Sequence, residues 1–249
     1  MFDHITIRVA DRSASERFYD TVLAALAVEQ TYRTSAFSEW RDFLVAAAEG
    51  TDRTTRGLHI GFVAPSREHV EGFWQAGTAA GYADDGGPGP RPEYRPDYYG
   101  AFLLDPDGNS VEAVHHGALR RDGIVDHLWI RVARLVAARR FYETIAPSAH
   151  LRIDTDTPQR VSFSGDEGSP TAAGGSFSLV PGTPTANVHI AFPTSDDADV
   201  RSFHHSAVAA GYRDNGAPGE RPRYHPGYYA AYVLDADGNN IEVVNHHRG

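Results

Sequence analysis

The sequence predicts an α+β fold of tandem repeats of paired βαβββ modules, each contributing strands to a mixed sheet. Three observations support this prediction. The two halves of the 249-residue chain resemble each other in order. In each half, an alternating strand pattern followed by a helical pattern occurs twice. Each half also ends in the same strand–turn–strand stretch, YGAFLLDPDGNSVE from Tyr99 and YAAYVLDADGNNIE from Tyr229.

The repeat between the halves has two offsets. FDHITIRV around His4 pairs with VDHLWIRV around His127, 123 residues later, whereas HIGF at His59 pairs with HIAF at His189, 130 residues later. The seven additional residues of the second half therefore lie before His189, and we place them in the loop-like stretch GDEGSPTAAGGS. We predict two domains, residues 1–117 and 124–249, joined by a short linker.

The first module of the N-terminal half begins with an alternating strand at residues 3–9. Ser13 and Glu16 have the spacing of a capping box, and Phe18 and Leu26 lie on one face of the helix that this box begins. Weaker strand patterns follow. The order is therefore strand, helix, further strands.

The second module repeats this order. The strand HIGFV precedes a predicted helix at Ser66–Ala80, which Gly81 ends. The strands YYGAFLL and SVEAVH follow, joined by the turn DPDGN, whose proline and glycine suit a tight turn.

Composition excludes several classes of protein. The formal net charge of −10 argues against nucleic-acid binding. No apolar run approaches the ~20 residues of a membrane span, and the N-terminal stretch has no signal-peptide pattern, so we expect a cytoplasmic protein. Without cysteine, a metal ion could be held by nitrogen and oxygen ligands only.

Histidines and a glutamate recur on the predicted strands at corresponding places of each half. Two neutral imidazoles and one carboxylate, converging on one ion, leave coordination positions open for a substrate, as in non-heme Fe(II) oxygenases. The set also suits Mn(II), Zn(II) or Ni(II). The predicted metal ligands are His4, His59, Glu112, His127, His189 and Glu242.

A single histidine at the start of a strand more often binds solvent or a backbone carbonyl than a metal. The repetition of the whole set in register favours the metal. Glu112 in SVEAV and Glu242 in NIEVV lie between apolar neighbours, where an ionised carboxylate is costly unless a positive group meets it.

These modules, with His on the first strand, His in HI[AG]F and Glu after DxDGN, resemble the vicinal oxygen chelate superfamily. That superfamily includes glyoxalase I, extradiol dioxygenases, fosfomycin-resistance proteins and bleomycin-binding proteins. The resemblance covers nearly the whole chain and implies the glyoxalase/dioxygenase fold, in which cup-shaped sheets surround an ion that binds a substrate through adjacent oxygens. It implies the same six ligands.

Departures from the family patterns narrow the chemistry. Glyoxalase I-like proteins add a fourth ligand, a glutamate on the strand before the second histidine, but RDFLVAAAEG and GSFSLVPGTP have no carboxylate centred in the strand. A three-ligand site is closer to the dioxygenases and the fosfomycin-modifying proteins.

The second half also resembles the extradiol signature, through His225, Tyr232, Asp235, Gly238 and Glu242. This match implies that His225 is an acid–base residue and that Tyr232 hydrogen-bonds the substrate. The match is incomplete, and the alternative is that Tyr232 only packs and His225 only lines a loop. The departures are Ala231 and Ala236 in the second half, and Arg95 and Phe102 in place of His and Tyr in the first half.

Two loops, GGPGPRPEYRPDYYG and GAPGERPRYHPGYYA, are predicted to lie beside the two sites. Arg91, Arg221, Tyr99 and Tyr229 in these loops are candidates for contact with an anionic or aromatic substrate. Surface arginines and core tyrosines are the plainer explanation.

The sequence thus predicts a metal-dependent enzyme for a small-molecule substrate, with Fe(II) favoured and Zn, Ni or Mn as alternatives, and with dioxygenase-like chemistry first. Glyoxalase I-like lyase or isomerase activity and fosfomycin-type transfer or hydrolysis are alternatives. A non-catalytic antibiotic-binding protein is another, as is one catalytic site beside one structural site. We expect a monomer, as a pseudo-dimer of domains, or a homodimer.

The pairing of the modules is left open. Either each site is built within one half, or the modules are exchanged so that His4 joins His189 and Glu242. Both arrangements use the same six residues.

Overall fold

The computed structural model describes residues 1–50, 53–171 and 174–247. It contains two eight-stranded mixed sheets and four helices in this part of the chain, in agreement with the predicted α+β class. No helix of the described residues combines the length and apolar character needed to cross a bilayer.

Sheet 1, as we call it, has the strand order β10 (Leu151–Thr157), β11 (Arg160–Gly165), β12 (Ser176–Pro181), β9 (Val125–Val132), β5 (Leu58–Val63), β8 (Ser110–His115), β7 (Tyr99–Leu104) and β6 (Asp84–Pro90). Sheet 2 has the order β14 (Asp214–Glu220), β15 (Tyr229–Leu234), β16 (Asn240–Asn245), β13 (His189–Pro193), β1 (His4–Val9), β4 (Phe43–Ala47), β3 (Phe37–Trp40) and β2 (Tyr32–Arg33). Each sheet therefore takes four strands from each half of the sequence.

The two halves exchange modules at the centre of each sheet. In sheet 2, β1 pairs antiparallel with β13, with Ile5 opposite Ile190. In sheet 1, β9 pairs antiparallel with β5, with Leu128 opposite Ile60. The question that the sequence left open is settled in favour of the exchanged arrangement. The ranges 1–117 and 124–249 mark the sequence repeat, and their role as separate folding domains stays a prediction.

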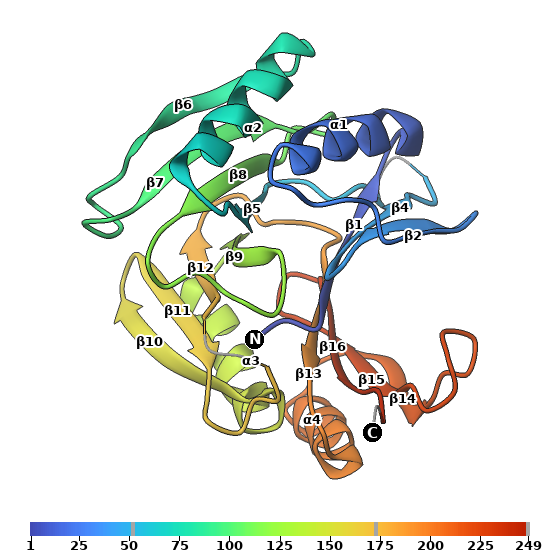
Figure 1. Cartoon of the computed structure of the whole chain (residues 1–249). Helices are drawn as coiled ribbons and strands as arrows, with labels where there is room; N and C mark the ends of the chain where they lie inside the picture. Colours follow the sequence, from blue (N-terminus) through green and yellow to red (C-terminus); the bar gives the residue numbers. More distant parts are fainter. Residues whose placement is uncertain (51–52, 172–173, 248–249) are drawn as a thin grey trace.

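The helices, in contrast, pair within each half. Helix α1 (Arg12–Ala24) packs beside α2 (Arg67–Ala79), and α3 (Leu135–Ala149) beside α4 (Asp197–Ala209), and the two pairs lie at opposite ends of the molecule in Figure 1. Helix α1 covers β4 of sheet 2, whereas α2 covers β7 and β8 of sheet 1. Each helix pair thus bridges the two sheets, and most of the buried apolar side chains of both halves form one continuous core.

The structure agrees with most of the predicted helix boundaries and loops. The helix predicted at residues 66–80 is α2 with Ser66 as its N-cap residue, and Gly81 follows it with φ +86°. The capping box at Ser13 and Glu16 was wrong, because Asp11 caps α1 by accepting a hydrogen bond from the Ala14 amide. The predicted insertion loop lies between β11 and β12, and its residues 172–173 are outside the described part of the chain.

Candidate metal centres

The six predicted ligands lie in two groups, one on each sheet. Site 1 consists of His59, Glu112 and His127, on β5, β8 and β9. Site 2 consists of His4, His189 and Glu242, on β1, β13 and β16. Each site takes one histidine from one half of the sequence, and its other histidine and its glutamate from the other half.

Strand register brings the site 1 side chains together. Gly61 of β5 lies opposite Glu112 in the parallel neighbour β8 and opposite His127 in the antiparallel neighbour β9. His59 is two residues before Gly61, so its side chain points to the same face of the sheet. The absence of a side chain at Gly61 makes room for the His127 ring, because a Cβ at residue 61 would lie 2.7 Å from Nε2 of His127.

The donor atoms of site 1 form a nearly equilateral triangle. Nε2 of His59, Nε2 of His127 and Oε2 of Glu112 are each 3.1 Å from the other two. Three ligands about 2.1 Å from one ion and at right angles to one another would lie about 3.0 Å apart. Glu112 is 1% exposed. This geometry and this donor set fit a divalent ion held on one face, with its other positions open.

Site 2 is looser. Nε2 of His189 lies 2.8 Å from Oε2 of Glu242, whereas Nε2 of His4 lies 3.7 Å from the same oxygen. Ala191, the counterpart of Gly61, lies opposite both His4 and Glu242. The Cβ of Ala191 occupies the space that the His127 ring fills in site 1, which accounts for the greater distance of His4.

Neighbouring side chains hold the atoms that do not face the sites. The hydroxyls of Tyr98 and Tyr228 donate to Oε1 of Glu112 and of Glu242, at 2.8 and 2.7 Å. As a result, Oε2 of each glutamate remains directed at the histidines. Tyr98 and Tyr228 were not predicted, although the repeated pair of tyrosines in YYG and YYA contained the signal.

Aspartates orient the first-strand histidine of each site. Asp126 accepts a hydrogen bond from Nδ1 of His127 at 3.0 Å, and Asp3 accepts one from Nδ1 of His4 at 2.7 Å. A carboxylate behind an imidazole is the usual support of a metal-binding histidine, since it leaves Nε2 free to bind. The repeated dipeptide Asp-His was a visible signal for these residues that the sequence analysis missed.

Electrostatics keeps the glutamates ionised despite their burial. Burial alone raises the pKa of Glu112, but hydrogen bonds from His127 and His59 outweigh it and hold the pKa at about 2. For His127, burial lowers the pKa, and hydrogen bonds to Asp126 and Glu112 overcome this and raise it to about 10. Hydrogen bonds and charges at site 2 likewise lower the pKa of Glu242, against the opposing effect of burial. Without a metal, protonated His127 therefore compensates the charge of Glu112, and a divalent ion bound at site 1 would replace that proton.

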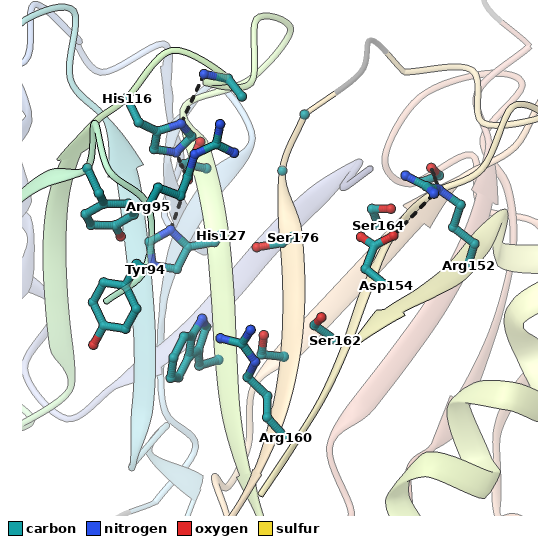
Figure 2. Close-up of a pocket in the computed structure, with 18 of the residues that line it drawn as sticks. Tyr94, Arg95, His116, His127, Arg152, Asp154, Arg160, Ser162, Ser164 and Ser176 are labelled. Atoms are coloured by element: carbon teal, nitrogen blue, oxygen red, sulfur yellow. Dashed lines mark hydrogen bonds and ion pairs between the residues drawn. The ribbon is translucent and has the colours of Figure 1, made fainter. Parts of the chain in front are cut away.

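Two hollows adjoin site 1. The smaller, about 370 Å³, is lined by all three site 1 residues together with Arg91 and Arg131. The larger, about 870 Å³, is lined by His127, Tyr94 and Arg160 among others. Figure 2 shows Tyr94 and His127 on one side of the larger hollow, Arg152, Asp154 and Ser164 on the opposite side, and Ser162 and Ser176 between them. A small molecule can therefore reach site 1.

The predicted substrate contacts divide into two groups. Arg91 lines the smaller hollow with the site 1 ligands, and its guanidinium is 5.4 Å from the ring of Phe102. The guanidinium of Arg221 is 5.5 Å from the ring of Tyr232. Tyr99 and Tyr229 are not brought to the sites. The Tyr99 hydroxyl donates to Glu71 of α2, and Tyr229 packs against the core.

The two residues predicted to be catalytic both lie near site 2. The Tyr232 ring is 6.1 Å from that of His189. Its hydroxyl interacts with Glu242, and burial together with the Glu242 charge raises the pKa of Tyr232. His225 does not reach the ligands. Its Nε2 is 2.8 Å from His246, and Nε2 of His246 is 2.8 Å from Asp3.

A fourth carboxylate ligand is absent from the strands on which it would be expected. In sheet 2, β4 (Phe43–Ala47) runs beside β1, and in sheet 1, β12 (Ser176–Pro181) runs beside β9. Neither strand contains an acidic residue. Among the described residues, each potential metal group has three members.

Comparisons with known proteins agree with this architecture. Residues 1–113 match the family described as the Glyoxalase/Bleomycin resistance protein/Dioxygenase superfamily. A comparison with proteins of curated function found no match. Among solved structures, glyoxalase I from Zea mays is 17% identical with a TM-score of 0.68, over 98% of this chain and 92% of its own.

A second similar structure is a putative dioxygenase from Bacillus subtilis subsp. subtilis str. 168. It is 16% identical with a TM-score of 0.65, over 100% of this chain and 86% of its own. Identities this low show a shared fold only. The predicted resemblance is confirmed: residues 1–113 match the Glyoxalase/Bleomycin resistance protein/Dioxygenase superfamily by sequence, and nearly the whole chain shares the fold of these two structures.

Proposed function

We propose that this protein is a metal-dependent enzyme that binds a small substrate through adjacent oxygens at site 1, and that its reaction is dioxygenase-like. The observation that carries the proposal is the 3.1 Å triangle of His59, His127 and Glu112 beside two hollows. A divalent ion bound there would act as a Lewis acid toward the substrate oxygens.

The residues of the chain prepare the site for this role. Tyr98 holds Oε1 of Glu112, so the glutamate offers a single oxygen. Asp126 and Ser110 bind the Nδ1 atoms of His127 and His59, which fixes both imidazole rings. All three ligand side chains are thus held before a metal arrives, which lowers the cost of ordering them.

The choice of reaction rests on the number of ligands. Two histidines and one carboxylate on one face are typical of non-heme Fe(II) oxygenases, so Fe(II) is the favoured ion, with Zn, Ni or Mn as alternatives. The structurally similar proteins include one described as glyoxalase I and one described as a putative dioxygenase. The absence of an acidic residue from β4 and β12 favours the second description.

Site 2 is proposed as a second metal site with its own polar group. The Tyr232 hydroxyl would hydrogen-bond a molecule held beside Glu242, whereas Phe102, opposite Glu112, occupies the corresponding position of site 1. His225 would pass protons between solvent and site 2, because His246 and Asp3 connect it to His4.

Metal content tests the proposal first. The protein and its Glu112→Gln and Glu242→Gln variants are loaded anaerobically with Fe(II), desalted and analysed for metal. We expect each variant to lose the metal of its own site. Glu143→Gln is the matched control, because Glu143 lies on the exposed face of α3, paired with Arg139. Full metal occupancy in both site variants would refute the proposal.

Oxygen uptake then distinguishes the reactions. The Fe(II)-loaded protein is offered catechols and quinols, and in parallel methylglyoxal–thiol adducts. Uptake that is lost in Glu112→Gln supports the dioxygenase. Conversion of the thiol adducts without oxygen would instead identify a glyoxalase-like lyase. Binding of aromatic compounds without metal or turnover would support the non-catalytic binding protein.

A further inference from the structure

The two sites differ in the side chains that the neighbouring strands place beside them. In sheet 1, Trp129 of β9 lies opposite Ser178 of β12, which lies opposite Ser162 of β11. In sheet 2, the corresponding row is Thr6, Leu44 and Glu39. Site 1 therefore has an indole and two hydroxyls where site 2 has a small hydroxyl, an apolar side chain and an acid.

Arg160 adds a positive charge to site 1. Its guanidinium lies 5.5 Å from the centre of the Trp129 ring, and it lines the larger hollow. Within residues 1–50, 53–171 and 174–247, Arg160 forms no ion pair. Phe37 holds the corresponding position in β3, two residues before Glu39, so site 2 has no counterpart of this cation.

Trp129 connects the cation with the ligands. Its ring is 5.9 Å from that of His59 and 5.9 Å, edge to face, from that of Tyr94. Trp129 and His127 line both hollows, the larger together with Arg160 and the smaller together with His59 and Glu112. An aromatic ring held against the indole would therefore lie between the ligands and Arg160. Arg160 is the appropriate group for a carboxylate there, because a guanidinium binds both oxygens of a carboxylate.

The acidic residues of the larger hollow do not oppose this arrangement. Asp126 is paired with His116 and His127. Asp154 is paired with Arg152, and Asp166 with His150. Glu93 and Glu167 are exposed to solvent. The wall beyond Ser162 continues with Ser164, whose buried hydroxyl has no partner among the described residues. This wall suits polar substituents better than alkyl groups.

We infer that site 1 accepts an aromatic carboxylate, with its ring against Trp129 and its carboxylate on Arg160, and that site 2 does not. This inference deepens the proposed function, since it names the substrate class of the same site. It makes Arg160 a specificity-determining residue.

Calorimetric titration with 3,4-dihydroxybenzoate and 3,4-dihydroxybenzamide tests it. Both probes carry the same adjacent oxygens and differ in charge. A charge-assisted pair with Arg160 predicts that the acid binds roughly tenfold more tightly than the amide. Arg160→Gln should bring the ratio of the two affinities close to one and leave the affinity for the amide unchanged. Arg139→Gln, on the outer face of α3, is the control and should retain the ratio.

Repeating the titrations with Glu112→Gln separates the two proposals. If Arg160 causes the preference, the acid remains favoured over the amide even where the metal of site 1 is lost. If the wild-type protein binds no metal but still prefers the acid over the amide, the proposed function is refuted and the inference about Arg160 is not. Equal affinities for the two probes, a preference that survives Arg160→Gln, or no binding of the acid at millimolar concentration would overturn the inference about Arg160.

Discussion

Gly61 and Ala191 occupy corresponding positions of β5 and β13, and the difference of one methyl group accounts for the difference between the two sites. In site 1, the His127 ring fills the space beside Gly61, and Nε2 comes within 3.1 Å of Glu112. In site 2, Ala191 lies opposite His4, which stays 3.7 Å from Glu242. A residue that is not a ligand thus sets the distance between the first-strand histidine and the glutamate in each site.

Gly61→Ala should therefore damage site 1 selectively. The new Cβ would displace His127, so we expect at least tenfold weaker metal binding at site 1, together with a loss of about 1–3 kcal/mol of stability from overpacking. Metal titration followed by calorimetry and urea unfolding measures both effects. The reciprocal variant, Ala191→Gly, should not weaken site 2. Wild-type metal affinity at site 1 in Gly61→Ala would contradict this account.

At the scale of elements, helix α1 is attached to β2 and β3 by a buried carboxylate. Glu16 is 4% exposed and accepts hydrogen bonds from Arg12 of its own helix, from Ser38 of β3 and from Arg33 of β2. Burial raises its pKa, but the hydrogen bonds from Ser38 and Arg12 outweigh burial and leave the pKa below its usual 4.5. Glu16 therefore stabilises the folded state only while ionised.

Glu16→Gln should destabilise the protein in a pH-dependent manner. A folded-state pKa below the unfolded one adds stability above pH 4.5, and this stability is lost as the pH falls through the folded pKa. We expect a loss of about 1–3 kcal/mol at neutral pH, the range for hydrogen bonds to a charged group, shrinking below pH 4.5. Urea unfolding across this range measures it. Glu143→Gln, an exposed pair, should change stability by less than about 1 kcal/mol at any pH. If the difference in free energy of unfolding between Glu16→Gln and wild type does not change with pH, Glu16 does not have this role.

The strands also show which features could be predicted from the sequence and which could not. Strand alternation and the repeat identified His4, His59 and Glu112 and their counterparts, because period-two patterns determine which side chains share a face. The pattern does not determine which strand lies beside which. The pairing of β1 with β13 depends on packing between modules whose sequences are alike, so either arrangement satisfies the same pattern.

Side-chain partners were harder to predict than ligands. The orientation of Tyr98 toward Glu112, with Tyr99 toward α2, depends on which face of β7 the helix covers. Glu16 has capping-box spacing but turns to β3, because Arg12, Ser38 and Arg33 all offer it donors there. These choices are made by tertiary contacts.

At the scale of the whole molecule, the segment between the halves fastens the exchanged modules. Arg120 is 3% exposed and donates to Asp42, which precedes β4 of sheet 2, and to the Phe2 carbonyl, which precedes β1. It also donates to the Val125 carbonyl in β9 of sheet 1. One guanidinium thus joins both sheets close to the strands that carry His4 and His127.

Arg120→Met should therefore destabilise the whole molecule. Burial raises the pKa of Asp42, and the charge of Arg120 offsets only part of this, so removing the guanidinium leaves a buried carboxylate uncompensated. We expect a loss of about 3–5 kcal/mol, the range for breaking one partner of a buried pair. The double variant Arg120→Met with Asp42→Leu should recover part of it, since no unpaired charge then remains. Urea unfolding of the four proteins gives the coupling energy. Strictly additive losses would show that Arg120 acts through its backbone contacts rather than through Asp42. Equal stability of Arg120→Met and wild type would show that the exchanged modules hold together without Arg120.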